Sequence, residues 1–166
     1  MGYVKDTKIN QFVPVGQISK SAGTWTPAVA SNVVSEARTA AAASFDLYIP
    51  VVLPGSEAYR QGAKLKSITV YYKIGTAAAT DFATVALNKM TLADPVSGEA
   101  VTVSMDADHD TAAERKTVDD HVMVVTLDTP VWIQEDEAFY LQCTVSAAAT
   151  TVFTLYGAVV GFELTL

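Results

Sequence analysis

Apolar and polar residues alternate along most of the chain from residue 44 onward, which is the pattern of half-buried β-strands. The clearest run is LKSITVYYKI, where Lys66, Ile68, Val70, Tyr72 and Ile74 share one face. We expect that face to point into the core. Similar runs occupy residues 45–53, 82–92, 100–104, 121–127, 131–133, 139–146 and 152–164.

These runs predict about eight strands joined by turns such as Asp94-Pro95. Only residues 33–43 and 111–118 have the composition of helices, and each is short enough to be marginal alone. An all-β chain of 166 residues closes into a sandwich or barrel more readily than into an open sheet. The sequence therefore predicts an all-β fold, a single β-sandwich or jelly-roll of about eight antiparallel strands.

The first 43 residues differ from the rest because their apolar anchors are few. Phe12, Ile18 and Trp25 are spread among prolines, glycines and an alanine-rich tract. Such a segment docks either on its own domain or on a neighbouring subunit. Our hypothesis is an extended N-terminal arm at 1–43, docking on a neighbour, followed by a β-sandwich domain at 44–166.

Two segments resemble each other within the chain. Residues 75–84, GTAAATDFAT, are similar to residues 145–154, VSAAATTVFT. Both place an Ala-Ala-Ala-Thr turn between two candidate strands, so both are predicted hairpins. The likeness indicates either a two-half architecture or convergent turn composition.

Charge is sparse and unevenly placed. Charged residues make up 17% of the chain, against about 25% in an average soluble protein. This low fraction favours a surface partly covered by a partner, although a well-filled core with alanine-rich loops gives the same number. The net charge is −7, which is the wrong sign for nucleic-acid binding. No apolar run reaches the roughly 20 residues of a membrane helix.

The acidic residues concentrate between positions 106 and 137. Asp106, Asp108 and Asp110 alternate there as the ligands of a cation loop do. The EF-hand pattern fails, however, because Thr111 and Thr117 stand where a glycine and a bidentate glutamate are needed. A solvated acidic loop is therefore the main interpretation, and a cation loop is the alternative.

Catalytic groups are few. Cys143 is the single cysteine and lies in an alternating run, which predicts a buried strand position and excludes an internal disulfide. His109 and His121 lie twelve residues apart and match no compact zinc spacing. We expect no catalytic residue, no cofactor and no enzyme, although a small hydrolase using the acidic segment stays open.

Four residues are candidates for a subunit interface. Tyr71 and Tyr72 are adjacent on one strand, so their side chains point to opposite faces of the sheet. Because Tyr72 shares the core face, Tyr71 points outward, and interfaces are enriched in tyrosine. The predicted interface residues are Phe12, Ile18, Trp25 and Tyr71.

The runs GAKLKSITVYYKIGTA at 62–77 and AFYLQCTV at 138–145, with LYGAVV at 155–160, resemble segments of bacteriophage virion structural proteins of the decoration (cement) or fibre type. The resemblance implies a jelly-roll or sandwich subunit, usually trimeric, and no shared functional site. The absence of a secretory signal in MGYVKDTK fits assembly in the host cytoplasm.

The functional hypothesis is therefore a non-enzymatic capsid decoration protein in the virion, a homotrimer that stabilises the shell. Its partners would be copies of itself and the major capsid protein or other virion proteins, without nucleic acid or membrane. The alternative is a carbohydrate- or receptor-binding module of a tail or head fibre. Its groove would be lined by aromatic candidates, namely Trp25, Tyr72, Trp132 and Tyr156.

Overall fold

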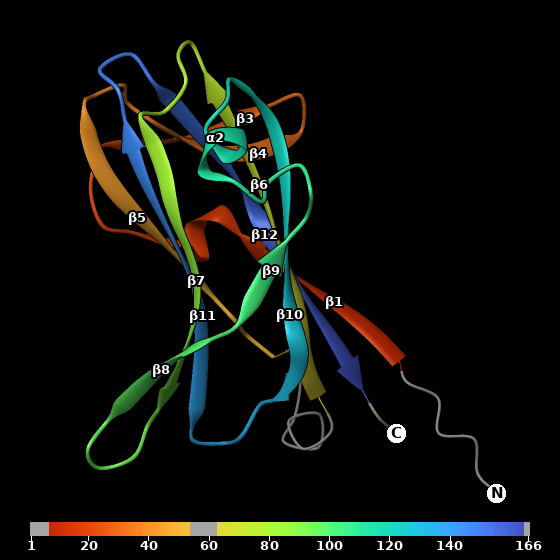
Figure 1. Ribbon diagram of the computed structural model, residues 1–166. Helices are drawn as coiled ribbons and strands as arrows, with labels where there is room; N and C mark the ends of the chain where they lie inside the picture. The colour runs from red at the N-terminus through yellow and green to blue at the C-terminus, as the bar shows by residue number, and fades with distance from the viewer. Residues whose placement is uncertain (1–6, 54–62, 165–166) are drawn as a thin grey trace, which may run out of the picture.

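The computed structural model describes residues 7–53 and 63–164, and these residues form two antiparallel β-sheets with very little helix (Figure 1). One sheet has seven strands: β1 (Thr7–Pro14), β3 (Trp25–Ala30), β4 (Val33–Arg38), β6 (Ala63–Gly75), β9 (Val103–Met105), β10 (Asp119–Trp132) and β12 (Val152–Leu164). The other sheet has five: β2 (Ser19–Lys20), β5 (Ala43–Pro50), β7 (Asp81–Thr91), β8 (Ser97–Val101) and β11 (Glu137–Ala147). The all-β prediction is confirmed.

The seven-stranded sheet is built around β12 and β6, its two central long strands. Its order is β3-β4-β12-β6-β10-β9, and β1 also pairs with β12. Along the edge of β12 away from β6, residues 153–155 pair with β4 and residues 157–164 pair with β1. The five-stranded sheet has the order β2-β5-β11-β7-β8. Strands from both ends of the chain therefore meet on β12.

Side chains from the facing sides of the two sheets form one hydrophobic core. In β6 the core side includes Ile68, Val70, Tyr72 and Ile74, all fully buried, as the alternation predicts. Lys66, placed on the same face by the sequence pattern, is only half-buried, whereas Leu65 is buried. The reason is a register shift between β12 and β6 at Gly161/Phe162, which reverses the alternation at that point.

A chain of aromatic rings crosses this core. Tyr72 stacks on Phe153, with ring centroids 5.3 Å apart and planes at 8°. Phe153 meets Phe45 edge-on at 5.3 Å, and Trp25 meets Phe45 at 5.4 Å. Because Phe45 lies on the five-stranded sheet and the others lie on the seven-stranded sheet, these contacts join the two sheets.

The segment predicted as an extended arm contributes four strands, β1 to β4, to the sheets of its own chain. This also corrects the expected helix at 33–43, because residues 33–38 form β4 and pair with both β3 and β12. Residues 33–38, VVSEAR, include only one alanine, and residues 39–42 lie in neither helix nor strand, so the helix propensity of the alanine-rich tract is not realised. Whether this segment also contacts a neighbouring subunit stays a prediction.

The predicted strand count of about eight is correspondingly too low, since the described residues form twelve strands. After residue 43 the number is as expected, with two differences in detail. The predicted strand at 100–104 divides into β8 and β9, which belong to different sheets. The predicted strands at 121–127 and 131–133 join into β10 across a register shift.

The two similar segments at 75–84 and 145–154 are not hairpins. Each carries the chain from one sheet to the other, from β6 to β7 and from β11 to β12. The two turns also contact each other, since the Thr80 amide donates to the Ser146 carbonyl at 2.7 Å and Thr151 Oγ1 donates to the Ala78 carbonyl at 2.9 Å. They are paired corners at one end of the fold, which alternation alone does not distinguish from hairpins.

Helix is confined, within the described ranges, to a 3₁₀ turn at Val15–Gln17 and to α2 (Ala112–Arg115). The short α2 confirms helix inside the predicted stretch 111–118. In the same part of the chain, no helix has the length and apolar character needed to cross a membrane.

If residues 7–38 are integral to the core, Ile18→Ala should lower the free energy of unfolding by about 2–5 kcal/mol, the cost of a large-to-small change in a core. Ile18 is 3% exposed. Val29→Ala is the matched control, because Val29 is 74% exposed, and it should change the stability by no more than about 0.5 kcal/mol. Urea denaturation measures both. Equal, small effects would indicate a detachable arm.

Candidate functional site

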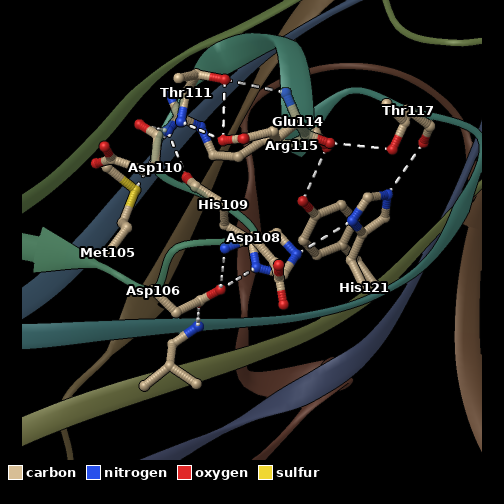
Figure 2. Close-up of polar contacts among 12 residues, drawn as sticks. Met105, Asp106, Asp108, His109, Asp110, Thr111, Glu114, Arg115, Thr117 and His121 are labelled. Atoms are coloured by element: carbon tan, nitrogen blue, oxygen red, sulfur yellow. Dashed lines mark hydrogen bonds and ion pairs between the residues drawn. The ribbon is translucent and has the colours of Figure 1, made fainter.

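The loop between β9 and β10 carries the densest polar network of the described residues, and α2 lies at its centre (Figure 2). Thr111 caps α2: its Oγ1 accepts from the Glu114 amide at 3.3 Å, and its own amide donates to Glu114 Oε2 at 2.8 Å. A threonine followed three residues later by glutamate forms this reciprocal cap at a helix start. The cap fixes the direction in which Arg115 leaves the helix.

Arg115 is buried and binds backbone carbonyls on both sides of it. Its Nη1 donates to the carbonyls of His109 at 2.8 Å and Asp110 at 2.9 Å, and its Nε donates to the carbonyl of Phe82 at 3.1 Å. The Arg115 carbonyl in turn accepts from the Tyr72 hydroxyl at 2.8 Å. This one side chain therefore ties the loop to β7, while its backbone ties the loop to β6.

Asp106 is the acceptor at the start of the loop. Its carboxylate accepts from the Val124 amide at 2.6 Å and the Asp108 amide at 3.2 Å, and it contacts His109 Nδ1 at 2.6 Å. Burial favours the neutral acid, but the hydrogen bonds from His109 and from the Val124 amide outweigh it and lower the pKa of Asp106. Asp106 is therefore an ionised partner for the imidazole.

His109 and His121 complete the network from opposite sides. Nε2 of His109 lies 3.2 Å from Nδ1 of His121, and Nε2 of His121 lies 3.0 Å from the Thr117 carbonyl oxygen. The ring of His121 stacks on Tyr72 with centroids 4.6 Å apart and planes at 9°. All four ring nitrogens thus have a partner, and none is left to activate a nucleophile.

Beside the two imidazoles the surface has an open hollow of about 470 Å³. Its wall contains carboxylates from the loop, from α2 and from the start of β10, namely those of Asp106, Asp108, Glu114, Asp119 and Asp120. The sequence alone places these acids in one stretch. It does not show that they surround a pair of buried histidines, because that depends on the return of β10 alongside β9.

The alternative cation loop at Asp106, Asp108 and Asp110 is not assembled in this arrangement, because Asp106 is turned to His109 and to two backbone amides. Within residues 7–53 and 63–164, no three or more His, Cys, Asp or Glu side chains are grouped so as to hold a metal ion. Cys143 is fully buried in β11, and burial raises the pKa of its thiol to about 12.

The four predicted interface residues divide into two pairs. Ile18 is in the core, and Trp25 is half-buried against Phe45 and Phe153. Phe12 and Tyr71, by contrast, both lie on the outer face of the seven-stranded sheet, since Val13 on β1 and Val70 and Tyr72 on β6 are buried in the core.

Phe12 and Tyr71 are part of a larger apolar surface, which we call the outer apolar band. Register places Phe12 opposite Val159, Val159 opposite Thr69, and Thr69 opposite Val124. In the next row Tyr71 lies between Val122 and the Tyr156–Gly157 bulge. The band crosses β1, β12, β6 and β10; its members are Phe12, Tyr71, Val122, Val124, Tyr156 and Val159.

Four of these six residues, those on β10 and β12, are not predicted as interface residues by the sequence analysis, which names Tyr156 only as a candidate for a sugar-binding groove. The alternation within each strand indicates that each of these residues faces away from the core. Only the strand order shows that they are neighbours on the sheet. Gly157 belongs to the same surface. Its φ is +131°, and a Cβ there would lie 2.8 Å from the Val13 carbonyl oxygen and 3.0 Å from the Phe12 ring, so glycine lets β1 and the Phe12 ring lie close against β12.

No family model and no curated protein matches this chain. Among solved structures, one similar chain is described as a conserved carbohydrate esterase from Shiga toxin-encoding bacteriophage phi24B, with 14% identity, a TM-score of 0.39 and 90% of each chain covered. Another is an arabinose-bound α-L-arabinofuranosidase, with 7% identity and a TM-score of 0.37. That match covers 91% of this chain and 24% of the other chain.

Arg115→Met should lower the free energy of unfolding by about 2–4 kcal/mol, because it leaves several buried carbonyls without a donor. The neighbouring Lys116→Met is the matched control. Lys116 donates to the Thr80 carbonyl at an exposed position, so its loss should cost no more than about 0.5 kcal/mol. Chemical denaturation measures both variants, and equal costs would contradict the central role of Arg115.

Proposed function

We propose that this protein is a non-enzymatic structural subunit that assembles with copies of itself through the outer apolar band. The band carries the proposal, because register places its six apolar side chains on one face of four paired strands, around Thr69. Phe12 is 54% exposed and Val122 is 52% exposed. A contiguous exposed apolar patch of this kind is typical of an interaction surface.

The charges around the band favour a second copy as the occupant. Lys73 pairs with Asp120 at 3.0 Å beside Tyr71 and Val122, and Lys66 pairs with Glu163 at 3.0 Å toward the other end of β6. The chain carries −7 and its acids concentrate between residues 106 and 137, so two copies repel each other mainly where these segments approach. Where the flanking charges are already paired, two copies meet at the lowest electrostatic cost.

The finer assignment rests on the resemblance of the strands to bacteriophage structural proteins. On that basis the subunit is a capsid decoration or cement protein of jelly-roll type, a homotrimer that binds the major capsid protein and stabilises the shell of the virion. The low charge content and the apolar outer face support a protein that works within an assembly. The sandwich itself supplies a rigid, compact unit for such a role.

The self-association test compares two aspartate substitutions on opposite sheets. Wild-type protein should increase in mass with concentration toward a trimer in sedimentation equilibrium, whereas Val122→Asp should stay monomeric because it places a charge in the band. Thr84→Asp, at an exposed position of β7 on the other sheet, should assemble as wild type does. A wild-type protein that is monomeric throughout the range, or equal loss in both variants, would contradict the proposal.

A second candidate function is glycan binding, for which the five-stranded sheet supplies the surface. Tyr48 and Tyr140 lie side by side on its outer face with centroids 6.0 Å apart. The amide side chains of Asn88 and Gln142 are their register neighbours, and a hollow of about 290 Å³ adjoins Tyr140. Aromatic rings with nearby amides offer both stacking and hydrogen bonding to a sugar.

This site differs from the aromatic groove expected from the sequence. Tyr72 is fully buried, Trp25 packs into the core, and Tyr156 belongs to the other sheet. Trp132 is 40% exposed but stacks under the Lys64 ammonium at 4.5 Å. These four residues do not line one groove.

On a glycan array, wild-type protein should bind if the second candidate is right, and Tyr140→Ala should lose the signal because stacking is removed. Tyr156→Ala, on the opposite face, is the matched control and should bind as wild type does. Silence of the wild-type protein on the array, or equal binding by all three, would rule out a glycan site at Tyr140.

A further inference from the structure

The network Asp106–His109–His121–Thr117 needs more protons than two neutral histidines supply. It contains three contacts: Asp106 Oδ1 to His109 Nδ1 at 2.6 Å, His109 Nε2 to His121 Nδ1 at 3.2 Å, and His121 Nε2 to the Thr117 carbonyl at 3.0 Å (Figure 2). Each contact requires one hydrogen between its two atoms. Two neutral imidazoles carry only two.

The two ends of the network accept hydrogen bonds and donate none. The Thr117 carbonyl is an acceptor in every state, so His121 Nε2 must hold a hydrogen. Asp106 already accepts from the amides of Val124 and Asp108, and these bonds favour its ionised form. His109 Nδ1 must therefore hold a hydrogen as well. In a neutral pair, the two inner nitrogens would then face each other with lone pairs only.

The geometry between the inner nitrogens suits a proton. The ring centroids lie 5.3 Å apart, which is close to the sum of the 3.2 Å contact and the two distances from ring centre to nitrogen, so the two lone pairs point almost directly at each other. A linear N–H···N hydrogen bond has this arrangement. A metal ion bonded at about 2.0–2.1 Å to both nitrogens would lie well off the line between them.

We propose that His109 and His121 form a single proton-binding unit that holds one extra proton between them in the folded protein. The unit then carries one positive charge, which the ionised Asp106 carboxylate balances inside the loop. The face of the Tyr72 ring, stacked on His121 at 4.6 Å, also stabilises a cation.

The other charged groups around the pair act in both directions. The carboxylates of Asp108, Glu114, Asp119 and Asp120 line the hollow beside it and favour the extra proton. The Arg115 guanidinium, which donates to the His109 carbonyl, opposes the extra proton. On β6, Tyr72 is neutral because burial raises the pKa of its hydroxyl, and Lys73 is paired with Asp120.

One shared proton gives the fold a distinct dependence on pH. In the unfolded chain each histidine titrates near about pH 6.5, so the unfolded state holds two protons on its histidines in acid and none in base. The three contacts require the folded pair to hold one. Below about pH 6.5 the unfolded state binds more protons, so stability rises with pH; above it the folded state binds more, so stability falls. The proton maintains the contact that holds the loop to β10.

Direct proton counting by NMR is the first test and needs no substitution. The chain has two histidines, so a long-range ¹H–¹⁵N spectrum of the labelled full chain at pH 7.5 shows their four ring nitrogens. The proposal requires three protonated nitrogens. Two protonated nitrogens would overturn it, and so would loss of the shared proton on adding one equivalent of Zn²⁺, which would make the pair a metal site.

The second test is the equilibrium constant of unfolding between pH 5.5 and 8. For wild type it should pass through a minimum near about pH 6.5 and rise on either side by up to about tenfold per pH unit, the limit for one proton. His121→Asn should lose the minimum, because the one remaining histidine exchanges a single proton and gives a profile that slopes in one direction only. Asp108→Asn removes a nearby carboxylate and should keep the minimum. A wild-type profile without a minimum would overturn the proposal.

Discussion

The stack of His121, Tyr72 and Phe153 is the interaction on which the rest of this structure depends. Tyr72 lies between the other two rings, at 4.6 Å from His121 and 5.3 Å from Phe153. Through Phe153 the stack reaches Phe45 on the other sheet and so joins the two sheets. Through the Tyr72 hydroxyl it fixes the Arg115 carbonyl, and through His121 it fixes the polar loop. Tyr72 therefore links the packing of the core to α2, the only α-helix of the described residues.

The alternation in β6 connects this interior to the outer surface. Because Tyr72 points into the core, Tyr71 must point out, where it joins Phe12, Val122 and Tyr156 in the outer apolar band. The two faces of the seven-stranded sheet therefore differ: the inner face packs in the core, and the outer face is the contact proposed between copies of the protein. The polar loop lies at the start of β10, next to both, since His121 faces inward and Val122 outward.

The sequence predicts the β-class, most strand positions after residue 43, the inward position of Tyr72 and the burial of Cys143 because each depends on local alternation. Prediction from the sequence fails where strand pairing determines the structure. Residues 33–43 include an alanine-rich stretch that favours helix, but residues 33–38 form β4 by pairing with β3 and β12. The similar turns at 75–84 and 145–154 change sheets, which their composition does not reveal. The histidine pair joins a loop residue to β10, and the apolar band joins residues of four strands, so neither is visible until the strand order is known.

The central claim is that the outer face of the seven-stranded sheet is covered in the assembled protein. Hydroxyl-radical footprinting of dilute and concentrated protein tests it directly, because aromatic side chains report on each face separately. The account predicts that Phe12, Tyr71 and Tyr156 lose reactivity as concentration rises, while Tyr48 and Tyr140 on the other sheet keep theirs. Unchanged reactivity of the first three residues, or protection confined to Tyr48 and Tyr140, would contradict it.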